Sequence, residues 1–397
     1  MSGLSKSRLN RMHDVMAGYV QRGEMPGLVT LVSRRGETHV DAIGSLSIGG
    51  AAMRRDTIFR MSSMTKPVAA IATLMLIEDG KLKLDEPVDR LLPELADRRV
   101  MKNVDGPIDE TVPARRAITV RDLLTFRLGY GFVMTSADAP YTLATAQAGL
   151  APGPNAPTME PDEYMRRLGS LPLAYQPGAR WLYHTGSDVL GVLIARAAGQ
   201  SFDAFLQERV FGPLGMKDTG FFVPPSKIDR LATSYWTNFQ TGELEVFDEA
   251  KGGRWSKPPA FPSGGSGLVS TADDFLAFSR MMLGKGALGG VRIVSRPSIE
   301  AMISDQLTSD QRSTPGMVED YFDSHGWGFG VAMATRRVNP AEPVGQYGWD
   351  GGLGTSWRCD PTEDMVTILL TQHMWTSPVP PDVCVDFWTQ SYAAIED

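Results

Sequence analysis

Apolar and polar positions follow two different spacings along this chain, and the spacings divide it into elements. Apolar residues recur at a helical interval over residues 5–22, and Gly23 ends that pattern. Two runs of strand character follow at residues 27–33 and 38–43, separated by a short polar turn, so we expect a β-hairpin. Residues 57–61 are expected to extend the same sheet.

The most hydrophobic stretch of the chain is the unbroken run at residues 68–77. Pro67 precedes it, at a position that the first turn of a helix tolerates well. The pattern predicts a buried helix over residues 63–78. The run is far too short to cross a bilayer, so it indicates a core helix and no membrane span.

The middle of the chain alternates short helical patterns with stretches rich in proline, glycine and polar residues. The expected helices lie at residues 119–125, 160–168, 187–198 and 202–210. Residues 135–161 contain five prolines, which favours a surface loop or lid.

Strand patterns return towards the C-terminus. After an expected helix at residues 271–283, the remaining expected elements are strands at 326–334, 345–349, 355–359 and 365–371 and a helix at 383–395. Strands at both chain ends with helices between them favour an α+β fold. We expect an antiparallel sheet formed by the N- and C-terminal segments and flanked by helices, with a mostly helical domain inserted.

The expected domain boundaries follow from this order. Residues 1–80 and 263–397 would form the α/β domain with the antiparallel sheet, and residues 81–262 the inserted, mostly helical domain. A cleft between two such domains is the expected place for a functional site.

Composition narrows the function classes. Hydrophobic residues make up 42% and charged residues 21%, the net charge is −7, and no large basic cluster occurs, so neither nucleic acid nor a membrane is an expected partner. Residues 1–23 lack the apolar block of an export signal. Cys359 and Cys384, the only cysteines, are expected to be free thiols of a cytoplasmic protein. The five histidines form no metal-binding grouping, so no metal is expected.

The first candidate for chemistry is Ser63, three residues before Lys66 at the start of the apolar helix. Residues i and i+3 share a helix face, so the amine would lie beside the hydroxyl. A neighbouring base turns a serine hydroxyl into a good nucleophile. The alternative is a helix-capping serine followed by a solvated lysine, and the spacing alone does not exclude it.

Two further segments carry candidate residues. Tyr183 follows a Pro-Gly turn and an aromatic stretch and directly precedes an expected helix, a context that the similar tripeptide at Tyr235 lacks. The glycine-rich segment at residues 347–354 follows a strand, and its glycines would allow a ligand to approach backbone N–H groups of the kind an oxyanion requires. A packed core tyrosine and a plain hairpin turn are the alternatives.

Taken together and in this order, the Ser63/Lys66 pair, Tyr183 and the Trp349-Asp350-Gly351 tripeptide resemble the motifs of the serine β-lactamase and penicillin-binding-protein superfamily. They are most similar to those of the family VIII carboxylesterases, relatives of class C β-lactamases. The segments that also match this family are residues 119–125, 213–220, 264–268 and 355–361. The resemblance covers about residues 10–395.

The resemblance implies roles for individual residues. Ser63 would be the acylated nucleophile, Lys66 and Tyr183 its catalytic partners, and the backbone N–H groups of Ser63 and Gly352 the oxyanion donors. Either Lys66 or Tyr183 would serve as the base, since burial lowers a lysine pKa and a neighbouring ammonium acidifies a phenol. No cofactor is implied, and the expected partner is a small-molecule ester. The residues expected to bind substrate are Trp349, Asp350, Gly351, Thr185, Tyr130, Phe132 and Trp181.

Three departures from the superfamily pattern bear on the activity. Trp349 stands where lactamases carry Lys or His, so β-lactam hydrolysis is expected to be slow or absent. Thr185 stands where class C enzymes carry asparagine, and a hydroxyl offers fewer donors than an amide. Residues 126–129 replace the more usual His-Thr-Ser-Gly, which leaves the local shape open.

Three functions remain open on the sequence. The leading one is a carboxylesterase acting on short or medium acyl chains through an acyl-enzyme on Ser63. The second is another activity of the superfamily: a β-lactamase, a D-Ala-peptide or amide hydrolase, or an acyltransferase. The third is a binding or sensor protein that is acylated without turnover.

Overall fold

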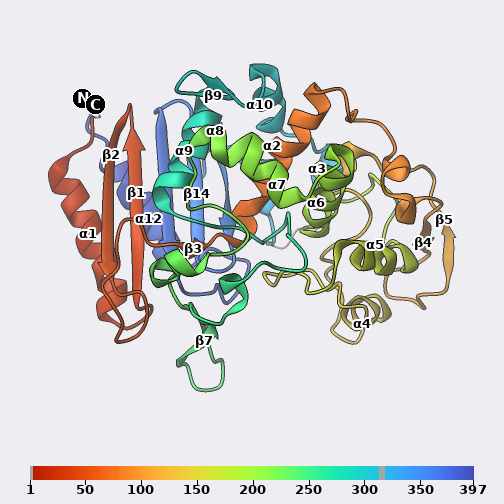
Figure 1. Ribbon diagram of the computed structural model, residues 1–397, viewed down its shortest axis with the longest axis horizontal. Coiled ribbons are helices and arrows are strands. Elements are labelled where there is room, and N and C mark those ends of the chain that lie inside the picture. Colours follow the sequence, from red (N-terminus) through yellow and green to blue (C-terminus); the bar gives the residue numbers. More distant parts are fainter. Residues whose placement is uncertain (1–2, 313–317) are drawn as a thin grey trace.

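The computed structural model describes residues 3–312 and 318–397, and its largest feature is a seven-stranded antiparallel sheet (Figure 1). The strand order is β11-β12-β13-β14-β15-β1-β2. The strands are β1 (Gly27–Arg34), β2 (Glu37–Gly44), β11 (His325–Trp327), β12 (Ala332–Ala334), β13 (Tyr347–Gly351), β14 (Thr355–Asp360) and β15 (Met365–Thr371). Strand β1 pairs with β15, with Leu31 opposite Ile368, so both chain ends build the sheet as predicted.

Strand β1 is buried along its whole length because helices cover both faces of the sheet. Leu28 and Val32 belong to the cluster formed with α1 (Lys6–Gln21) and α12 (Asp382–Ala393). The alternate residues Val29 and Leu31 join the main core cluster, which includes residues of α9 (Ala272–Leu283). This two-residue alternation is the pattern of a strand buried on both sides.

The nucleophile segment enters the middle of the molecule. A short 3₁₀ turn, η1 (Ser62–Met64), leads directly into α2 (Thr65–Glu78), whose residues are buried from Thr65 to Leu76. Helix α2 packs against α6 (Thr185–Ala198) and lies between the sheet and the helical part of the chain (Figure 1). The predicted core helix is therefore present, with its first residue, Ser63, in the 3₁₀ turn.

Residues 81–262 contain six α-helices joined by long loops, and helices make up less than half of this part. Their helices are α3 (Val120–Leu124), α4 (Pro140–Gln147), α5 (Pro161–Ser170), α6, α7 (Phe202–Leu206) and α8 (Gly212–Leu214), and a π-helical turn at Gln207–Phe211 joins the last two. Two small ribbons, β4 (Arg99–Met101) with β5 (Thr111–Pro113) and β6 (Ser234–Thr237) with β7 (Leu244–Asp248), complete this part. The main core cluster runs from the sheet through α2 into these helices. The division into two domains stays a prediction.

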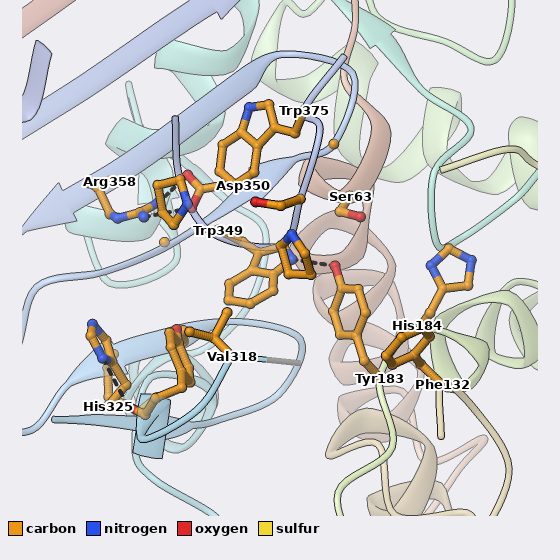
Figure 2. Close-up of a pocket in the computed structure, with 18 of the residues that line it drawn as sticks. Ser63, Phe132, Tyr183, His184, Val318, His325, Trp349, Asp350, Arg358 and Trp375 are labelled. Atoms are coloured by element: carbon orange, nitrogen blue, oxygen red, sulfur yellow. Dashed lines mark hydrogen bonds and ion pairs between the residues drawn. The ribbon is translucent and has the colours of Figure 1, made fainter. Parts of the chain in front are cut away.

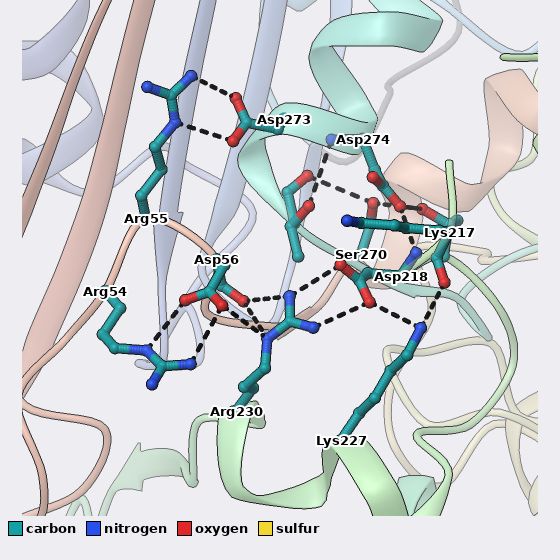
Figure 3. Close-up of polar contacts among 12 residues, drawn as sticks. Arg54, Arg55, Asp56, Lys217, Asp218, Lys227, Arg230, Ser270, Asp273 and Asp274 are labelled. Atoms are coloured by element: carbon teal, nitrogen blue, oxygen red, sulfur yellow. Dashed lines mark hydrogen bonds and ion pairs between the residues drawn. The ribbon is translucent and has the colours of Figure 1, made fainter. Parts of the chain in front are cut away.

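Three expectations from the sequence need correction. Residues 57–61 do not extend the main sheet, because β3 (Phe59–Arg60) pairs instead with the distant β8 (Val269–Ser270), whose Ser270 lies among the polar contacts drawn in Figure 3. The proline-rich stretch at 135–161 contains α4, which starts at Pro140, a favourable first helical residue. The single strand expected at 326–334 is two strands, β11 and β12, because the chain turns between them at Gly330, where φ is +69°.

The remaining α-helices and short strands lie between β8 and β11 in the chain. They are α10 (Arg296–Met302), α11 (Ser309–Arg312), β9 (Ala287–Leu288) and β10 (Val291–Arg292). Within the described residues, no single helix has the length and apolar character to cross a membrane; one sharply bent pair, Thr185–Ala198 with Phe202–Leu214, meets those two criteria jointly. Cys359 and Cys384 are both buried free thiols, as predicted.

Candidate active site

A cavity of about 510 Å³ opens beside Ser63, between the edge of the sheet and loops of the helical part (Figure 2). Seven of the residues singled out in the sequence line it: Ser63, Phe132, Trp181, Tyr183, Trp349, Asp350 and Gly352. Most of the other lining side chains are apolar or aromatic and come from loops and strands far apart in the sequence, such as Pro154, Tyr321, Met333, Trp375 and Trp388. The structure thus brings all three motif segments to one cavity.

Lys66 lies directly beneath the nucleophile. Its Nζ is 2.8 Å from Ser63 Oγ and 2.6 Å from the carbonyl oxygen of Gly265. The lysine side chain is completely buried, and this burial lowers its pKa to about 7, although the carboxylate of Asp188 acts in the opposite direction. A substantial fraction of this amine is therefore neutral near pH 7, as a base must be.

The loop before the nucleophile is held by the end of strand β13. Ser62 has a positive φ of 45°, which few residues other than glycine adopt. Gly351 lies so close to this loop that a Cβ atom would collide with the carbonyl oxygen of Met61. Thr355 also donates a hydrogen bond of 3.1 Å to that carbonyl. Gly351, expected to bind substrate, does not line the cavity and instead allows this close packing.

Tyr183 faces the nucleophile from the chain segment just before α6. The indole Nε1 of Trp349 donates a 2.6 Å hydrogen bond to the Tyr183 hydroxyl (Figure 2). The ring of Phe126, one of the residues that depart from the family pattern, packs edge-on against the Tyr183 ring at 5.6 Å. Lys66 Nζ lies over the ring itself, 4.7 Å from its centroid.

The environment of Tyr183 corrects the expectation of an acidified phenol. Burial raises the pKa of Tyr183 above its ordinary value, and interactions with Ser63 and Trp349 offset this only in part. The ammonium form of Lys66 contacts the ring face, where it stabilises a phenolate less than a hydrogen bond to the oxygen would. The phenol therefore stays protonated at neutral pH.

His184 is a site residue that the sequence did not single out. Its Nδ1 lies 3.3 Å from Lys66 Nζ, and its Nε2 lies 3.2 Å from a carboxylate oxygen of Asp188. Burial and the neighbouring Lys66 lower the pKa of this imidazole. The sequence feature that points to this residue is its spacing from Asp188, which follows four residues later at the start of an expected helix.

Two other residues expected to bind substrate lie behind the cavity wall. Thr185 is the first residue of α6, is buried, and does not line the cavity. Tyr130 is likewise fully buried, with its ring 5.5 Å from that of Tyr141, and is also absent from the lining. Both side chains are packed in the interior, so neither of them contacts the space in which a substrate would bind.

At the far end of the cavity, Arg358 and Asp350 form an ion pair. Both terminal nitrogens of Arg358 donate to the carboxylate of Asp350, at 2.7 and 2.8 Å (Figure 2). The guanidinium also lies over the ring of Trp388, 4.5 Å from its centroid. Near them, His325 lies 3.8 Å from the carboxylate of Glu342. Asp350 therefore lines the cavity with its charge already compensated, and Arg358 is not a free receptor for an anion.

The two expected oxyanion donors both reach the cavity. Ser63 is the middle residue of η1, which leads into α2, and Gly352 directly follows β13; both residues line the cavity. The nearest atom to a Cβ built on Gly352 would be Pro154 Cβ, at 3.7 Å, so the space beside this glycine is open. Donation by these two backbone N–H groups to an oxyanion stays a prediction.

Comparison with known proteins agrees with this geometry. The family model described as Beta-lactamase matches residues 12–381. Protein Rv1367c of Mycobacterium tuberculosis is 38% identical over 92% of this chain and 88% of its own length. Esterase EstB of Burkholderia gladioli is 31% identical, over 91% and 89%. Among solved structures, EstCE1, a hydrolase with promiscuous acyltransferase activity, is 25% identical and superposes with a TM-score of 0.79 over 98% of this chain and 99% of its own.

These matches cover the whole site. The family model begins before the sheet and extends past Trp349, so it includes the Ser63/Lys66 pair, Tyr183 and the segment after β13. The long alignments with relatives above 30% identity span the same residues. The chain belongs to the beta-lactamase family.

Proposed function

We propose that this protein is a carboxylesterase of the family VIII type, which hydrolyses esters with short or medium acyl chains through an acyl-enzyme on Ser63. One observation carries the proposal: the 2.8 Å contact between Ser63 Oγ and a buried Lys66 amine at the wall of a cavity. The similarity to Esterase EstB supports ester hydrolysis as the chemistry.

Lys66 is the general base of the first step. Burial lowers its pKa to about 7, whereas burial raises the pKa of Tyr183, so the amine is the group that is available to take a proton. Ser63 Oγ gives its proton to Nζ and attacks the ester carbonyl carbon. The carbonyl oxygen becomes an oxyanion between the backbone N–H groups of Ser63 and Gly352.

Tyr183 acts on the leaving group. When the tetrahedral intermediate collapses, the bond between the carbonyl carbon and the alcohol oxygen breaks, and the departing oxygen needs a proton. The proton that Lys66 took from Ser63 is returned to that oxygen, and the Tyr183 hydroxyl beside Ser63 donates a hydrogen bond to the oxygen as it leaves. The hydrogen bond from Trp349 Nε1 stabilises negative charge that develops on the phenol oxygen during this transfer.

Deacylation repeats these steps with water in place of the alcohol. The neutral amine of Lys66 is restored when the alcohol leaves with its proton. A water molecule on the cavity side of the acyl group then loses a proton to the same base and attacks the acyl carbon. The products are the carboxylic acid and free Ser63.

Two features of the cavity favour an ester over a β-lactam. Trp349 stands where lactamases carry Lys or His, and its indole is engaged with Tyr183. Arg358, a cation in the lining, is tied to Asp350 on both terminal nitrogens. Among the described residues that line the cavity, Arg358 is the only Lys or Arg, so a substrate carboxylate has no free guanidinium or lysine ammonium to bind.

Acyl transfer to an alcohol is the second candidate. A cavity of about 510 Å³ lined largely by apolar side chains has room for an acceptor alcohol as well as an acyl group. EstCE1, whose fold this chain shares, is described as a hydrolase with promiscuous acyltransferase activity. An alcohol bound there would compete with water for the acyl-enzyme.

The discriminating experiment is a panel of p-nitrophenyl esters from acetate to laurate, with nitrocefin as the β-lactam. We expect turnover of the short and medium esters and at most slow hydrolysis of nitrocefin. Adding an apolar alcohol and analysing the products separates hydrolysis from transfer. A persistent acyl adduct without turnover would instead identify a sensor protein, and rapid nitrocefin hydrolysis would identify a β-lactamase.

A cytoplasmic location is part of the same proposal. The two buried free cysteines, Cys359 and Cys384, are in keeping with a reducing compartment. Fractionation of cells that express the native protein, followed by immunodetection, tests it.

A further inference from the structure

We propose that His184, held by Asp188, is a positioning residue that aims the lone pair of Lys66 at the Ser63 hydroxyl. The inference deepens the proposed function and depends on it for its kinetic consequence. The tautomer of His184 and the direction of its hydrogen bond with Lys66 can be tested independently of that function.

The polar contacts of Lys66 Nζ carry the argument. Three groups surround the nitrogen: Ser63 Oγ at 2.8 Å, the Gly265 carbonyl oxygen at 2.6 Å and His184 Nδ1 at 3.3 Å. A carbonyl oxygen can only accept a hydrogen bond. A neutral amine has two N–H bonds and one lone pair, so one N–H is committed to Gly265 and the direction of the lone pair depends on His184.

Asp188 determines what His184 can offer. One carboxylate oxygen lies 3.2 Å from His184 Nε2, and the other accepts from Ser263 Oγ at 2.5 Å and from the backbone N–H of Gly265 at 3.0 Å. An ionised carboxylate only accepts, so Nε2 must carry the proton. In a neutral imidazole Nδ1 is then an acceptor and takes the second N–H of Lys66. The lone pair is left facing Ser63.

The backbone is shaped to place this ring. His184 adopts φ +87° and ψ −66°, a strained conformation that surrounding structure must enforce. Gly265 leaves room for the pair: a Cβ there would lie 3.0 Å from Asp188 Oδ1, 3.1 Å from His184 Cε1 and 3.2 Å from His184 Nε2. Gly265 therefore supplies one hydrogen-bond acceptor to Lys66, its carbonyl oxygen, and leaves space for the second acceptor, the His184 ring.

The charged and titratable groups around His184 agree with a neutral ring. Lys66 faces it from α2, Asp188 from α6, and the Tyr183 ring lies 6.0 Å away. Tyr164 of α5 interacts electrostatically with Asp188, and burial keeps its phenol protonated. Burial and Lys66 both lower the pKa of His184, so the ring is neutral when the site is active.

Two substitutions distinguish a positioning role of His184 from simple filling of space. His184→Leu keeps a side chain of similar size but removes the acceptor, so the lone pair loses its direction and the ammonium loses a partner. We expect kcat to fall about 10- to 100-fold with little change in KM, and the acid limb of the kcat profile to move to lower pH. His184→Asn puts an amide oxygen near the position of Nδ1 and restores most of kcat. His13→Leu, on the exposed face of α1, is the matched control.

The tautomer is measured directly by ¹⁵N NMR of histidine-labelled protein at pH 8, with the His184 signals assigned from the Asn variant. We expect the Nε2–H form, and its loss in Asp188→Asn. An Nδ1–H tautomer, or a folded Leu variant with wild-type kcat and an unshifted acid limb, would overturn the inference. If the wild-type protein hydrolyses no ester, the proposed function fails, and the NMR result still decides the inference.

Discussion

The Trp349 indole donates a 2.6 Å hydrogen bond to the Tyr183 hydroxyl, and this contact joins the second and third motifs of the site. A donor in this place leaves the phenol proton free to point towards the nucleophile and lowers the cost of negative charge on the phenol oxygen. Trp349 therefore supports the tyrosine, and its N–H is not available to bind a substrate carboxylate.

Replacing the indole tests that support. Trp349→Phe keeps an aromatic ring against Tyr183 but removes the N–H donor. Loss of one such hydrogen bond corresponds to about 1.4 kcal/mol, or tenfold in kcat. Steady-state kinetics with p-nitrophenyl butyrate measures it. An unchanged kcat would show that the indole only fills space.

Tyr183 and Tyr235 each begin a Tyr-x-Thr tripeptide, so they give a matched pair of substitutions. Tyr183→Phe removes the hydroxyl beside Ser63, and we expect kcat to fall by about a hundredfold or more. Tyr235→Phe removes a hydroxyl that instead accepts from the backbone N–H of Ile48, outside the cavity. We expect that variant to retain wild-type turnover. If Tyr235→Phe proved the damaging change, the second motif would be misassigned.

The pH dependence of turnover reports the state of Lys66. The base must be neutral, and burial lowers its pKa to about 7, so the reaction needs pH values above that point. We expect kcat/KM to rise about tenfold per pH unit below the pKa and to level off above it. Lys66→Arg, whose guanidinium never loses its proton, should be inactive at every pH. A flat profile between pH 5 and 9 would contradict this assignment.

Adjacent glycines test the packing behind the nucleophile. Gly351→Ala introduces a Cβ that collides with the Met61 carbonyl and the Thr355 hydroxyl, so we expect a loss of about 1–3 kcal/mol in unfolding free energy. Gly352→Ala meets its nearest atom at 3.7 Å and should keep wild-type stability. Urea unfolding compares the two variants. Equal stability would mean that the contact of β13 with η1 is looser than described.

Several features were predictable because they depend on local sequence. The strand character of residues 27–33 identifies β1, the unbroken apolar run identifies α2 as a buried helix, and the i, i+3 spacing of Ser63 and Lys66 places their side chains together. Pro140 at the first position of α4 is compatible with a helix start, but the prolines that follow it favour a loop, so the local pattern alone does not reveal this helix.

Other features depend on contacts between distant residues. Strand β3 pairs with β8 across about 200 residues, and no local pattern records that partner. Arg358 is engaged by Asp350 only because β13 and β14 are adjacent in the sheet. His184 turns towards Lys66 because its backbone is held at a positive φ, which the tripeptide sequence does not reveal.

The most direct test of the account is the covalent adduct on Ser63. Wild-type protein is mixed with p-nitrophenyl butyrate, quenched in acid within milliseconds, and analysed by intact mass and peptide mapping, with Ser62→Ala and Ser63→Ala alongside. We expect a transient gain of one butyryl group, mapped to Ser63, in the wild type and in Ser62→Ala. Ser63→Ala should be folded, unlabelled and inactive. An adduct on another residue, or full turnover by Ser63→Ala, would contradict the account.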